Sequence, residues 1–561
     1  MTADSRPALE RARTWSSQDP DSNTQAELDA LIERCASGDV DALAAVEHLF
    51  DGRLAFGTAG IRGPLQPGPR GMNRIVVGQT TAGLAQHLLA TISPAPGKRL
   101  RVVVGCDART NSDVFAMDTA AIFAGHGMEA ILLPVELPTP VLAFAVRVLA
   151  ADAGVMITAS HNPPRDNGYK VYLGGADEGS QIIPPVDRAI EDRIVDVAAT
   201  LKWHQIPRDS SAVQQAPLSL VADYVQATTA SVAPVNAQQD ALPIVYTAMH
   251  GVGAGTFRET LHHAGFSDII PVAEQINPDA AFPTVAFPNP EEAGALDLAV
   301  ATARKHHAAM ILAHDPDADR LAVALTRGDD YVKLTGNQVG AILGWHCASQ
   351  AKASGRTGTL ANSLVSSPVL GKIAQHFGLD HQETLTGFKY VSRVPNLIFG
   401  FEEALGYLVT PDVVRDKDGI SAGLMMLDLV HGLAAEGTTL WDYLETIEAS
   451  VGGFASSQIT ISLDTAAEGD SIPTKLRNNP PSTIGARAVS VCDDFLGGVE
   501  GFPPENILRY YLDEGSRVII RPSGTEPKLK VYLDTQAPSS LEASSSLEAL
   551  GKDLQELIAN L

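Results

Sequence analysis

A serine that could carry a phosphoryl group follows an apolar run near residue 160. Residues 158–163 read Thr-Ala-Ser-His-Asn-Pro and come directly after the apolar stretch 153–157. A buried strand that ends in a polar, Pro-stopped loop would present Ser160 beside His161 at the rim of a sheet. No Gly-x-Ser-x-Gly motif surrounds Ser160, which argues against an α/β-hydrolase. Adjacent side chains on an extended strand point to opposite faces, so no Ser–His dyad is expected. We interpret Ser160 as a phosphate carrier, with a turn or N-cap serine as the alternative.

Three carboxylates at alternating positions form a second candidate site. Asp315, Asp317 and Asp319 follow the apolar run 309–313 and precede Arg320. The loop is not an EF-hand, because Arg320 stands where that motif has glycine. Oxygen ligands suit Mg²⁺, which keeps positions open for phosphate oxygens, whereas a solvated turn is the alternative. A phosphorylated serine carries about −1.5 to −2 charges, so the serine and the acidic loop predict a common site with a divalent ion between them.

Two further loops offer groups that could bind a phosphosugar. Residues 521–528 (Arg-Pro-Ser-Gly-Thr-Glu-Pro-Lys) combine a guanidinium, two hydroxyls and a glycine that exposes backbone N–H groups, which is typical of phosphate binding. A Gly-Thr turn between strands is the alternative. Glu402 and Glu403 follow an apolar strand expected at 397–401 and could accept hydrogen bonds from sugar hydroxyls. Adjacent residues cannot flank a glycosidic bond from both sides, which argues against a glycosidase pair.

The order of apolar and polar segments predicts an α/β protein. Residues 1–50 are expected to be helical, and strands expected at 99–105, 129–133 and 154–158 alternate with helices, which indicates a largely parallel sheet. After a predicted linker at 208–217 the pattern restarts, with a helix near 291–307, and it restarts again after about residue 335. The last hundred residues have an α+β pattern.

We predict three similar α/β domains with mixed sheets plus a smaller C-terminal α+β domain around a central cleft. The predicted boundaries are 1–209 for the serine domain, 210–333 for the metal-loop domain, 334–452 for the sugar-loop domain and 453–561 for the phosphate-binding domain. Open α/β sheets bind ligands outside the carboxyl ends of their strands, and each domain has one candidate loop in that position.

Composition excludes several classes of partner. The 561 residues contain 41 Lys and Arg against 66 Asp and Glu, a net charge of −25 that repels nucleic acid and anionic lipid. A phosphate site must therefore concentrate cationic groups locally. The cysteines Cys35, Cys106, Cys347 and Cys492 form no CxxC motif, which argues against a zinc site or a disulfide framework. With no signal-peptide pattern and no long apolar run, we expect a cytoplasmic protein without membrane or nucleic-acid partners.

The four loops together resemble those of the α-D-phosphohexomutase superfamily. Within it, residues 56–63, residues 246–253 and the Glu-Glu-Ala-Leu-Gly loop at 402–406 are most similar to the phosphoglucomutase/phosphopentomutase branch. Four further stretches are similar to the family's: 57–63 (Gly-Thr-Ala-Gly-Ile-Arg-Gly), 167–170 (Asn-Gly-Tyr-Lys), 386–389 (Thr-Gly-Phe-Lys) and 415–419 (Arg-Asp-Lys-Asp-Gly). The resemblance implies a phosphoserine at Ser160 and a Mg²⁺ held by Ser160, Asp315, Asp317 and Asp319. It implies catalytic roles for Ser160, Lys170 and Arg62, and His161 is added as a catalytic candidate by its position beside Ser160. It implies substrate binding by Arg320, Thr386, Gly387, Lys389, Glu402, Lys417, Arg521, Ser523, Gly524 and Thr525.

The expected activity is a phosphosugar mutase that interconverts sugar 1-phosphate and 6-phosphate through a bisphosphorylated sugar, with glucose favoured. A sugar bisphosphate such as glucose 1,6-bisphosphate is the expected activator, and His161 or Lys170 the expected general acid/base. Ala404 stands where many hexomutases have serine, so phosphopentomutase and phosphomannomutase activities remain open. The sequence also leaves open a metal-dependent sugar phosphatase and a non-catalytic protein that binds sugar phosphates. It predicts no particular oligomeric state.

Overall fold

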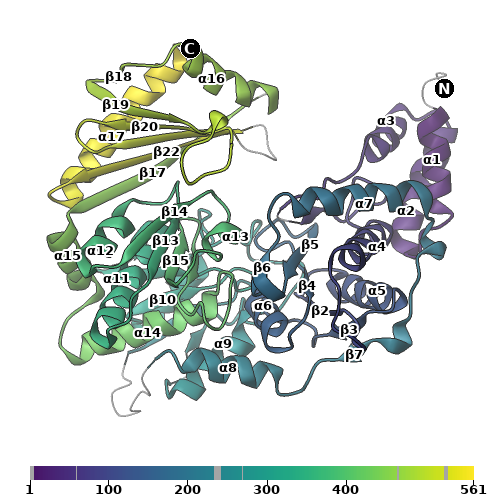
Figure 1. Cartoon of the computed structure of the whole chain (residues 1–561), viewed down its shortest axis with the longest axis horizontal. Helices are drawn as coiled ribbons and strands as arrows, with labels where there is room; N and C mark the ends of the chain where they lie inside the picture. The colour runs from purple at the N-terminus through teal and green to yellow at the C-terminus, as the bar shows by residue number, and fades with distance from the viewer. Residues whose placement is uncertain are drawn as a thin grey trace. The chain divides into compact units, whose positions relative to one another are not determined.

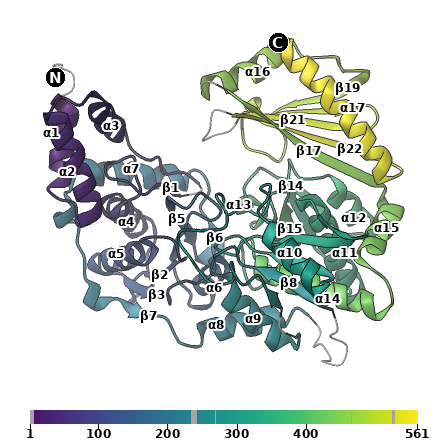
Figure 2. The same ribbon diagram turned by 180° about the vertical axis from the view of Figure 1, so that it is seen from behind.

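The computed structural model describes residues 6–58, 60–232, 242–267, 269–463, 466–522 and 528–560. The chain forms two compact units, and each is described by itself. Unit 1 comprises Met1–Leu334 and Gly406–Asp428, and unit 2 comprises Thr335–Leu405 and Leu429–Leu561. Figures 1 and 2 show the elements of both units from opposite sides.

Unit 1 begins with three helices, α1 (Arg6–Ser16), α2 (Ser22–Ala36) and α3 (Val40–Phe50), where the sequence predicts helical structure. The side chains of Asp21 and Asp39 accept hydrogen bonds from backbone N–H groups in the first turns of α2 and α3, which explains where these helices start. Trp15 of α1 packs edge-on against Phe50 of α3, with ring centroids 6.0 Å apart. This ring contact joins α1 to α3, and α2 packs against both, so the three helices form a small bundle.

The first sheet of unit 1 has the strand order β1-β5-β4-β2-β3-β7, with β6 paired to β5. Strands β2, β3, β4 and β7 are parallel neighbours, and β5 runs antiparallel to both β4 and β1. The prediction that residues 208–217 form a linker is partly wrong, because Gln214 and Gln215 pair with β3 at the sheet edge. The strands are β1 (Ile61–Pro64), β2 (Arg101–Cys106), β3 (Glu129–Leu132), β4 (Ala153–Ile157), β5 (Asp166–Leu173), β6 (Ser180–Gln181) and β7 (Gln214–Gln215).

Helices cover both faces of this sheet, which buries every residue of β4. Val102 and Val104 of β2 belong to the same core as α4 (Arg74–Thr91), α5 (Ser112–Gly125) and α7 (Val186–Thr200). On the other face, a Cβ at Gly154 would meet Val146 of α6 (Thr139–Val148) at 2.4 Å. The short 3₁₀ helices η2 (Gly175–Asp177), η3 (Trp203–Gln205) and η4 (Ser210–Ala212) complete this part of the unit.

The second sheet of unit 1 has the order β12-β11-β10-β8-β9, with β8, β9 and β10 parallel and β11 and β12 antiparallel. The helix predicted near 291–307 begins only at Asp297, because Pro290 and the left-handed Gly294 (φ 79°) precede it. The strands are β8 (Ile244–Thr247), β9 (Ile270–Pro271), β10 (Met310–Ala313), β11 (Ala322–Arg327) and β12 (Asp330–Lys333). The helices are α8 (Leu220–Thr229), α9 (Gly253–Ala264) and α10 (Asp297–His306). The unit also contains β16 (Gly406–Leu408) and the start of α14 (Gly419–Ala435).

Unit 2 contains a parallel set of strands in the order β14-β13-β15. These strands are β13 (Thr359–Ser363), β14 (Asp380–Thr384) and β15 (Leu397–Glu402), and their helices are α11 (Gly336–Ser354), α12 (Val369–Phe377), α13 (Phe388–Val391) and α15 (Leu440–Val451). Gly340 of α11 allows close packing, because a Cβ there would meet the Phe401 ring at 2.4 Å.

The C-terminal part of unit 2 is an antiparallel sheet in the order β17-β22-β21-β20-β19-β18. Its strands are β17 (Gly453–Ser462), β18 (Thr483–Ile484), β19 (Arg487–Asp494), β20 (Leu508–Leu512), β21 (Arg517–Pro522) and β22 (Lys528–Ala537), joined by α16 (Ala466–Asn478) and η5 (Phe495–Gly497). The closing helix α17 (Ser540–Ala559) packs along this sheet (Figures 1 and 2). Mixed sheets followed by this α+β region confirm the predicted fold class. Within the described ranges, no helix has both the length and the apolar character that crossing a membrane requires.

Candidate active site

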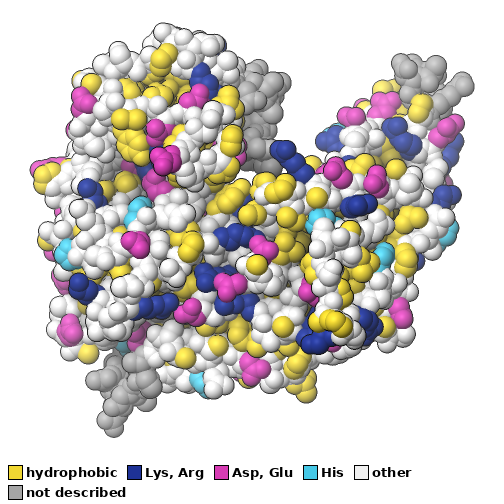
Figure 3. All heavy atoms as spheres, viewed as in Figure 1, with side chains coloured by type: hydrophobic (Ala, Val, Ile, Leu, Met, Phe, Trp, Pro, Cys, Tyr) yellow, Lys and Arg dark blue, Asp and Glu magenta, His cyan; other side chains and the backbone are white. Residues whose placement is uncertain are grey.

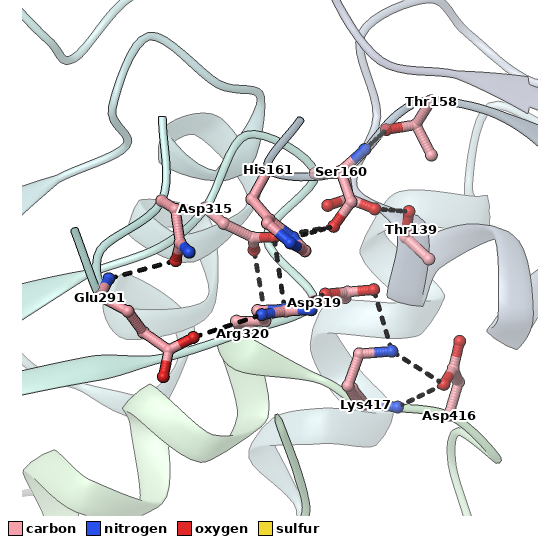
Figure 4. A network of polar contacts seen from close by, with 12 residues as sticks. Thr139, Thr158, Ser160, His161, Glu291, Asp315, Asp319, Arg320, Asp416 and Lys417 are labelled. Atoms are coloured by element: carbon pink, nitrogen blue, oxygen red, sulfur yellow. Dashed lines mark hydrogen bonds and ion pairs between the residues drawn. The ribbon is translucent and has the colours of Figure 1, made fainter. Parts of the chain in front are cut away.

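Ser160 lies in the turn that follows β4, and its backbone has the left-handed conformation, with φ 53°. Its N–H donates to Thr158 Oγ1 at 2.8 Å, and its Oγ donates to Asp315 Oδ2 at 3.0 Å. His161 Nδ1 lies 3.2 Å from the same Oγ. The expectation that Ser160 and His161 face apart is therefore wrong. The strand ends before Ser160, and the turn brings the ring beside the hydroxyl (Figure 4).

The acidic loop follows β10 of the second sheet in the same unit. Its turn is closed by a hydrogen bond from Ala318 N to Asp315 O at 2.9 Å, and Ala318 has a φ of 54°. Asp315, Asp317 and Asp319 are all buried, and one carboxylate oxygen from each lies within 4.8 Å of the others. The alternating positions noted in the sequence therefore converge on one point.

Two carboxylate oxygens of this cluster, Asp317 Oδ1 and Asp319 Oδ1, are buried and have no hydrogen-bond partner among the described residues. Buried polar atoms normally have a partner, and a divalent cation with oxygen ligands would satisfy both atoms. The donor set of the three aspartates therefore fits a hard divalent cation.

Cationic side chains from three segments of unit 1 face the carboxylates. Lys170 Nζ donates to Asp317 Oδ2 at 2.7 Å and to Asp319 Oδ2 at 3.0 Å. Lys417 Nζ lies 3.1 Å from Asp319 Oδ2, and Arg320 Nε lies 3.8 Å from Asp319 Oδ1. Because burying charge without a partner is costly, these cations make a buried cluster of carboxylates possible.

Strand β5 delivers Lys170, and its neighbour β1 delivers Arg62. Lys170 stands opposite Met156 of β4, one residue before the end of that strand, and Arg62 stands opposite Gly168. A Cβ at Gly168 would meet Thr158 O at 2.5 Å and Ile61 O at 2.8 Å, so glycine is required at this position. Burial lowers the pKa of Arg62, and the charge of Asp317 opposes that shift.

Burial and neighbouring charges shift the pKa values of the cluster in different directions. Burial, and then the charge of Asp317, raises the pKa of Asp315 well above its usual value. Burial acts in the same direction on Asp317, but the charge and hydrogen bond of Lys170 outweigh it and hold the pKa of Asp317 below its usual value. Burial, followed by the charges of Arg320 and Arg62, lowers the pKa of His161 well below its usual value.

The loop that carries Lys417 is fixed on both sides of that residue. Asp416 Oδ2 accepts hydrogen bonds from Tyr172 Oη at 2.9 Å and from Gln181 Nε2 at 2.8 Å. Asp418 accepts from Tyr224 Oη, with both carboxylate oxygens at 2.9 Å. These buried contacts tie the loop to β5 and α8 and direct Lys417 toward Asp319 (Figure 4).

In unit 2, the predicted sugar-binding residues lie around the carboxyl end of β15. Glu402 ends this strand, and its Oε1 accepts a hydrogen bond from Gly387 N at 2.7 Å, directly after Thr386. Lys389 belongs to α13, with Nζ 5.3 Å from the centroid of the Tyr390 ring. Glu403 is held inside the unit by the Ser366 hydroxyl at 2.8 Å, so Glu402 is the better placed of the two carboxylates to meet a ligand.

The predicted distal-phosphate residues are only partly described. Arg521 lies near the end of β21, opposite Lys530 of β22. Ser523, Gly524 and Thr525 lie outside the described residues.

Several residues at the site carry no signal of their own in the sequence. Thr139, at the start of α6, donates from Oγ1 to Asp317 Oδ2 at 2.6 Å. Tyr172 and Asp416 position the Lys417 loop, and Arg109 contacts the turn that holds Ser160. Two indirect signals exist: Asp416 lies within the motif that identifies Lys417, and Arg109 follows the apolar strand β2 as the predicted loops follow theirs.

Comparison with known proteins assigns this architecture to a family. Models of the phosphoglucomutase/phosphomannomutase family match four successive segments of the chain: α/β/α domain I at 53–200, domain II at 222–328, domain III at 335–450 and the C-terminal domain at 482–544. The helices α1, α2 and α3 precede the matched region.

Three relatives extend over most of the chain. A Haemophilus influenzae protein named "Probable phosphomannomutase" is 47% identical, over 87% of this chain and 98% of the relative. The phosphopentomutase of Homo sapiens is 34% identical, over 95% and 92% respectively. The phosphoglucomutase of Staphylococcus aureus strain USA300 is 33% identical, over 89% and 93%. The chain belongs to the phosphoglucomutase/phosphomannomutase family of the α-D-phosphohexomutase superfamily and is an enzyme that catalyses isomerisation by phosphoryl transfer.

Proposed function

We propose that the enzyme interconverts sugar 1-phosphates and 6-phosphates through a phosphoserine at Ser160 and a bisphosphorylated sugar, and that glucose phosphates are its preferred substrates. The observation that carries the proposal is the 3.0 Å contact between Ser160 Oγ and Asp315 Oδ2. It joins the serine hydroxyl of the turn to the three carboxylates that fit a divalent cation. The sequence indicates the same two roles for residues 158–163 and 315–320.

The chemical step requires a balanced exchange of two phosphate–oxygen bonds. A free sugar hydroxyl attacks the phosphorus of phospho-Ser160, the bond from phosphorus to Ser160 Oγ breaks, and a bond to the sugar oxygen forms. The sugar hydroxyl gives up its proton and Ser160 Oγ gains one. His161 is placed for this proton transfer, since its Nδ1 lies 3.2 Å from the serine oxygen. Lys170, whose Nζ donates to Asp317 and Asp319 of the same cluster, is the second candidate. The bisphosphate then turns end for end, and its other phosphate returns to Ser160.

The three aspartates and the phosphoryl group on Ser160 would together hold Mg²⁺. When bound, this ion would offset the charge of the transferring phosphoryl group. The protein adds its own positive charges, because Arg62, Lys170 and Arg320 lie around the same cluster. Preorganised charge of this kind is the main contribution that proteins make to phosphoryl transfer.

The remaining predicted residues would bind the substrate. Thr386, Gly387, Lys389 and Glu402 would contact the sugar, Lys417 would assist there, and Arg521, Ser523, Gly524 and Thr525 would hold the phosphate that does not react. Glucose 1,6-bisphosphate would serve as the activator by loading Ser160. A second candidate substrate is mannose phosphate, which is favoured by the 47% identity to the Haemophilus influenzae relative.

Replacing Ser160 by alanine tests the proposal. We expect Ser160→Ala to abolish isomerisation of glucose 1-phosphate, assayed with Mg²⁺ and glucose 1,6-bisphosphate, while the circular dichroism spectrum and melting temperature stay close to those of the unmodified enzyme. Ser516→Ala is a matched control, because Ser516 is a buried serine of unit 2 whose hydroxyl has no hydrogen-bond partner among the described residues.

The same assay separates this function from its competitors. Mannose 1-phosphate and ribose 1-phosphate are tested beside glucose 1-phosphate, and faster turnover of either would replace glucose as the preferred sugar. Steady release of inorganic phosphate in place of isomerisation would indicate a phosphatase. Substantial mutase activity in Ser160→Ala would reject the phosphoserine scheme.

A further inference from the structure

Arg109 gathers the backbone of the turn that holds Ser160. Its Nη2 donates to Ser160 O at 2.7 Å and to Asn162 O at 2.6 Å. Its Nη1 donates to Pro163 O at 2.8 Å and to Asp166 O at 3.0 Å. One guanidinium group therefore binds four carbonyl oxygens between the end of β4 and the start of β5, and the Arg109 residue is only 3% exposed.

Arg109 is itself held by two neighbours, Asp107 and Phe282. Its backbone N–H donates to Asp107 Oδ1 at 3.0 Å, and its Nε lies 3.5 Å from Asp107 Oδ2. The ring of Phe282 lies under the guanidinium, 5.0 Å from its central carbon. Asp107 N in turn donates to the carbonyl oxygen of Ile157, the last residue of β4, at 3.0 Å. The guanidinium is thus held at a fixed place relative to the strand that precedes Ser160.

The direction of the Ser160 hydroxyl depends on this turn. Ser160 has a φ of 53°, a conformation that residues other than glycine, asparagine and aspartate seldom adopt unless the surroundings impose it. The contact from Arg109 Nη2 fixes the Ser160 carbonyl, and the contact from Ser160 N to Thr158 Oγ1 fixes the N–H. With both peptide groups held, the side chain points toward Asp315.

We propose that Arg109 is a positioning residue for phosphoryl transfer, holding the Ser160 turn in the conformation that aims its oxygen at the acidic loop. Arg109 acts through the backbone of the turn and not on the transferring group. The inference deepens the proposed function and rests on it. A planar guanidinium can serve several carbonyls at once, whereas a lysine ammonium is a point charge with different geometry, so Arg109→Lys keeps the charge and loses the arrangement.

The test separates positioning from stability. We expect Arg109→Lys to lower kcat for glucose 1-phosphate by about 10- to 100-fold with KM changed by less than about twofold, since small misplacements of reacting groups carry penalties of that size. The rate at which glucose 1,6-bisphosphate transfers a phosphoryl group to Ser160 should fall by the same factor. Intact-protein mass spectrometry measures this rate. Arg74→Lys is the control, because Arg74 binds Asp118 through two hydrogen bonds at 2.7 and 2.8 Å. It should lose melting temperature and keep kcat.

Each outcome has one meaning. If Arg109→Lys loses melting temperature but loads Ser160 at the rate of the unmodified enzyme, Arg109 is only structural and the inference is wrong. If the unmodified enzyme itself fails to load Ser160, the proposed function fails, and the inference with it. Should Arg109→Lys not fold, Asp107→Asn replaces it, because this change removes the charge that holds the guanidinium. Slower loading of Ser160 in Asp107→Asn supports the inference, and an unchanged loading rate overturns it.

Discussion

At Ser160 the backbone, more than the side chain, decides which way the hydroxyl faces. A left-handed turn places the oxygen between Asp315 and His161, and both neighbours reach it within hydrogen-bond distance. The nearby carboxylates are in turn matched by Lys170 and Lys417. A phosphoryl group on Ser160 would therefore enter a site whose charges are already arranged in opposite pairs.

The Lys417 loop gives a residue-level prediction. Tyr172 Oη donates to Asp416 Oδ2 at 2.9 Å, and its loss in Tyr172→Phe should let the loop move and lower kcat by about 3- to 10-fold, the size expected for one buried hydrogen bond. Tyr169→Phe is the matched control. Tyr169 is equally buried on the same strand, but its Oη lies 3.2 Å from Thr81 Oγ1. Steady-state kinetics of both variants measure and compare their kcat values. Equal losses of kcat in the two variants would show that the Asp416 contact has no special role.

Site residues can be predicted from the sequence where several of them lie close together along the chain. The acidic loop and the 158–163 turn can be predicted because each concentrates its chemistry in one short segment. Thr139 has no such signal and Arg109 only an indirect one, because each is a single residue far along the chain from its partner. Thr139 lies 178 positions from Asp317, and Arg109 lies 51 positions from Ser160. The orientation of His161 is predicted wrongly from the sequence, because the extended geometry of β4 does not continue through Ser160.

At the scale of elements, the start of α14 sets the position of the Lys417 loop. Asp418 Oδ1 accepts hydrogen bonds from the N–H groups of Ile420 and Ser421, at 3.0 and 3.1 Å, in the first turn of α14. Burial raises the pKa of Asp418 from 3.8 to about 6. Between these two values the folded protein holds a proton on Asp418 that the unfolded chain releases, so this group's contribution to the free energy of unfolding falls as pH rises.

Replacing Asp418 by asparagine should remove that dependence. The free energy of unfolding of Asp418→Asn, minus that of the unmodified protein, should rise by up to about 3 kcal/mol as pH increases from about 4 to about 6. Denaturant melts of both proteins at a series of pH values measure this difference. Asp442→Asn is the control, because Asp442 is exposed and its own hydrogen bonds with Thr439 lower its pKa. A difference for Asp418→Asn that stays level across the window would contradict the assignment.

Elements with a clear pattern of apolar residues can be predicted, and those without one cannot. The apolar strands β2, β4 and β10 lie where the sequence places them. Strand β14 reads Asp-His-Gln-Glu-Thr and pairs with β13 although it has no apolar residue. Helix α4 is buried on nearly all sides and so shows no apolar stripe. Such elements are defined by their tertiary neighbours.

At the scale of the whole molecule, an excess of acidic residues coexists with a site that concentrates cationic side chains around its carboxylates. The net charge is −25, yet Arg62, Lys170, Arg320 and Lys417 all belong to unit 1 and face its acidic loop or lie beside it. On the face shown in Figure 3, dark blue and magenta side chains are interspersed on the surface of both units. The domain order is predictable because each domain restarts the same pattern of strands and helices, whereas the boundaries proposed from that pattern remain predictions.

Within unit 2, a buried ion cluster joins the C-terminal sheet to the parallel strands. Glu383 of β14 accepts from Arg509 Nη1 at 2.9 Å and from Arg517 Nη1 at 2.7 Å. Leu364 and Leu385 pack beside this cluster in one apolar core with Ile519 of β21. Charge pairing and apolar packing therefore act together at this junction.

Removing Glu383 should loosen the junction. We expect Glu383→Ala to lower the free energy of exposing the β21 amides by about 1.5–3 kcal/mol, because two guanidinium groups lose a charged hydrogen-bond partner. Arg509 keeps its contact with Asp493, and Arg517 keeps its contact with Asp534. Native-state amide hydrogen exchange measures this value. Asp330→Ala removes an exposed partner of Arg304 and should leave the exchange of β21 unchanged. Unaltered protection of β21 in Glu383→Ala would show that packing alone holds the sheet.

The most direct measurement follows a single phosphoryl group through the enzyme. Protein loaded with an isotopically labelled phosphoryl group from labelled glucose 1,6-bisphosphate is mixed with unlabelled glucose 1-phosphate and Mg²⁺, quenched at short times and digested for peptide mass spectrometry. We expect one labelled phosphoryl group, on Ser160, which leaves for the sugar at least as fast as the enzyme turns over and is replaced there by an unlabelled one. A labelled phosphoryl group on another residue, or a label that stays on Ser160 while product accumulates, would contradict the covalent scheme.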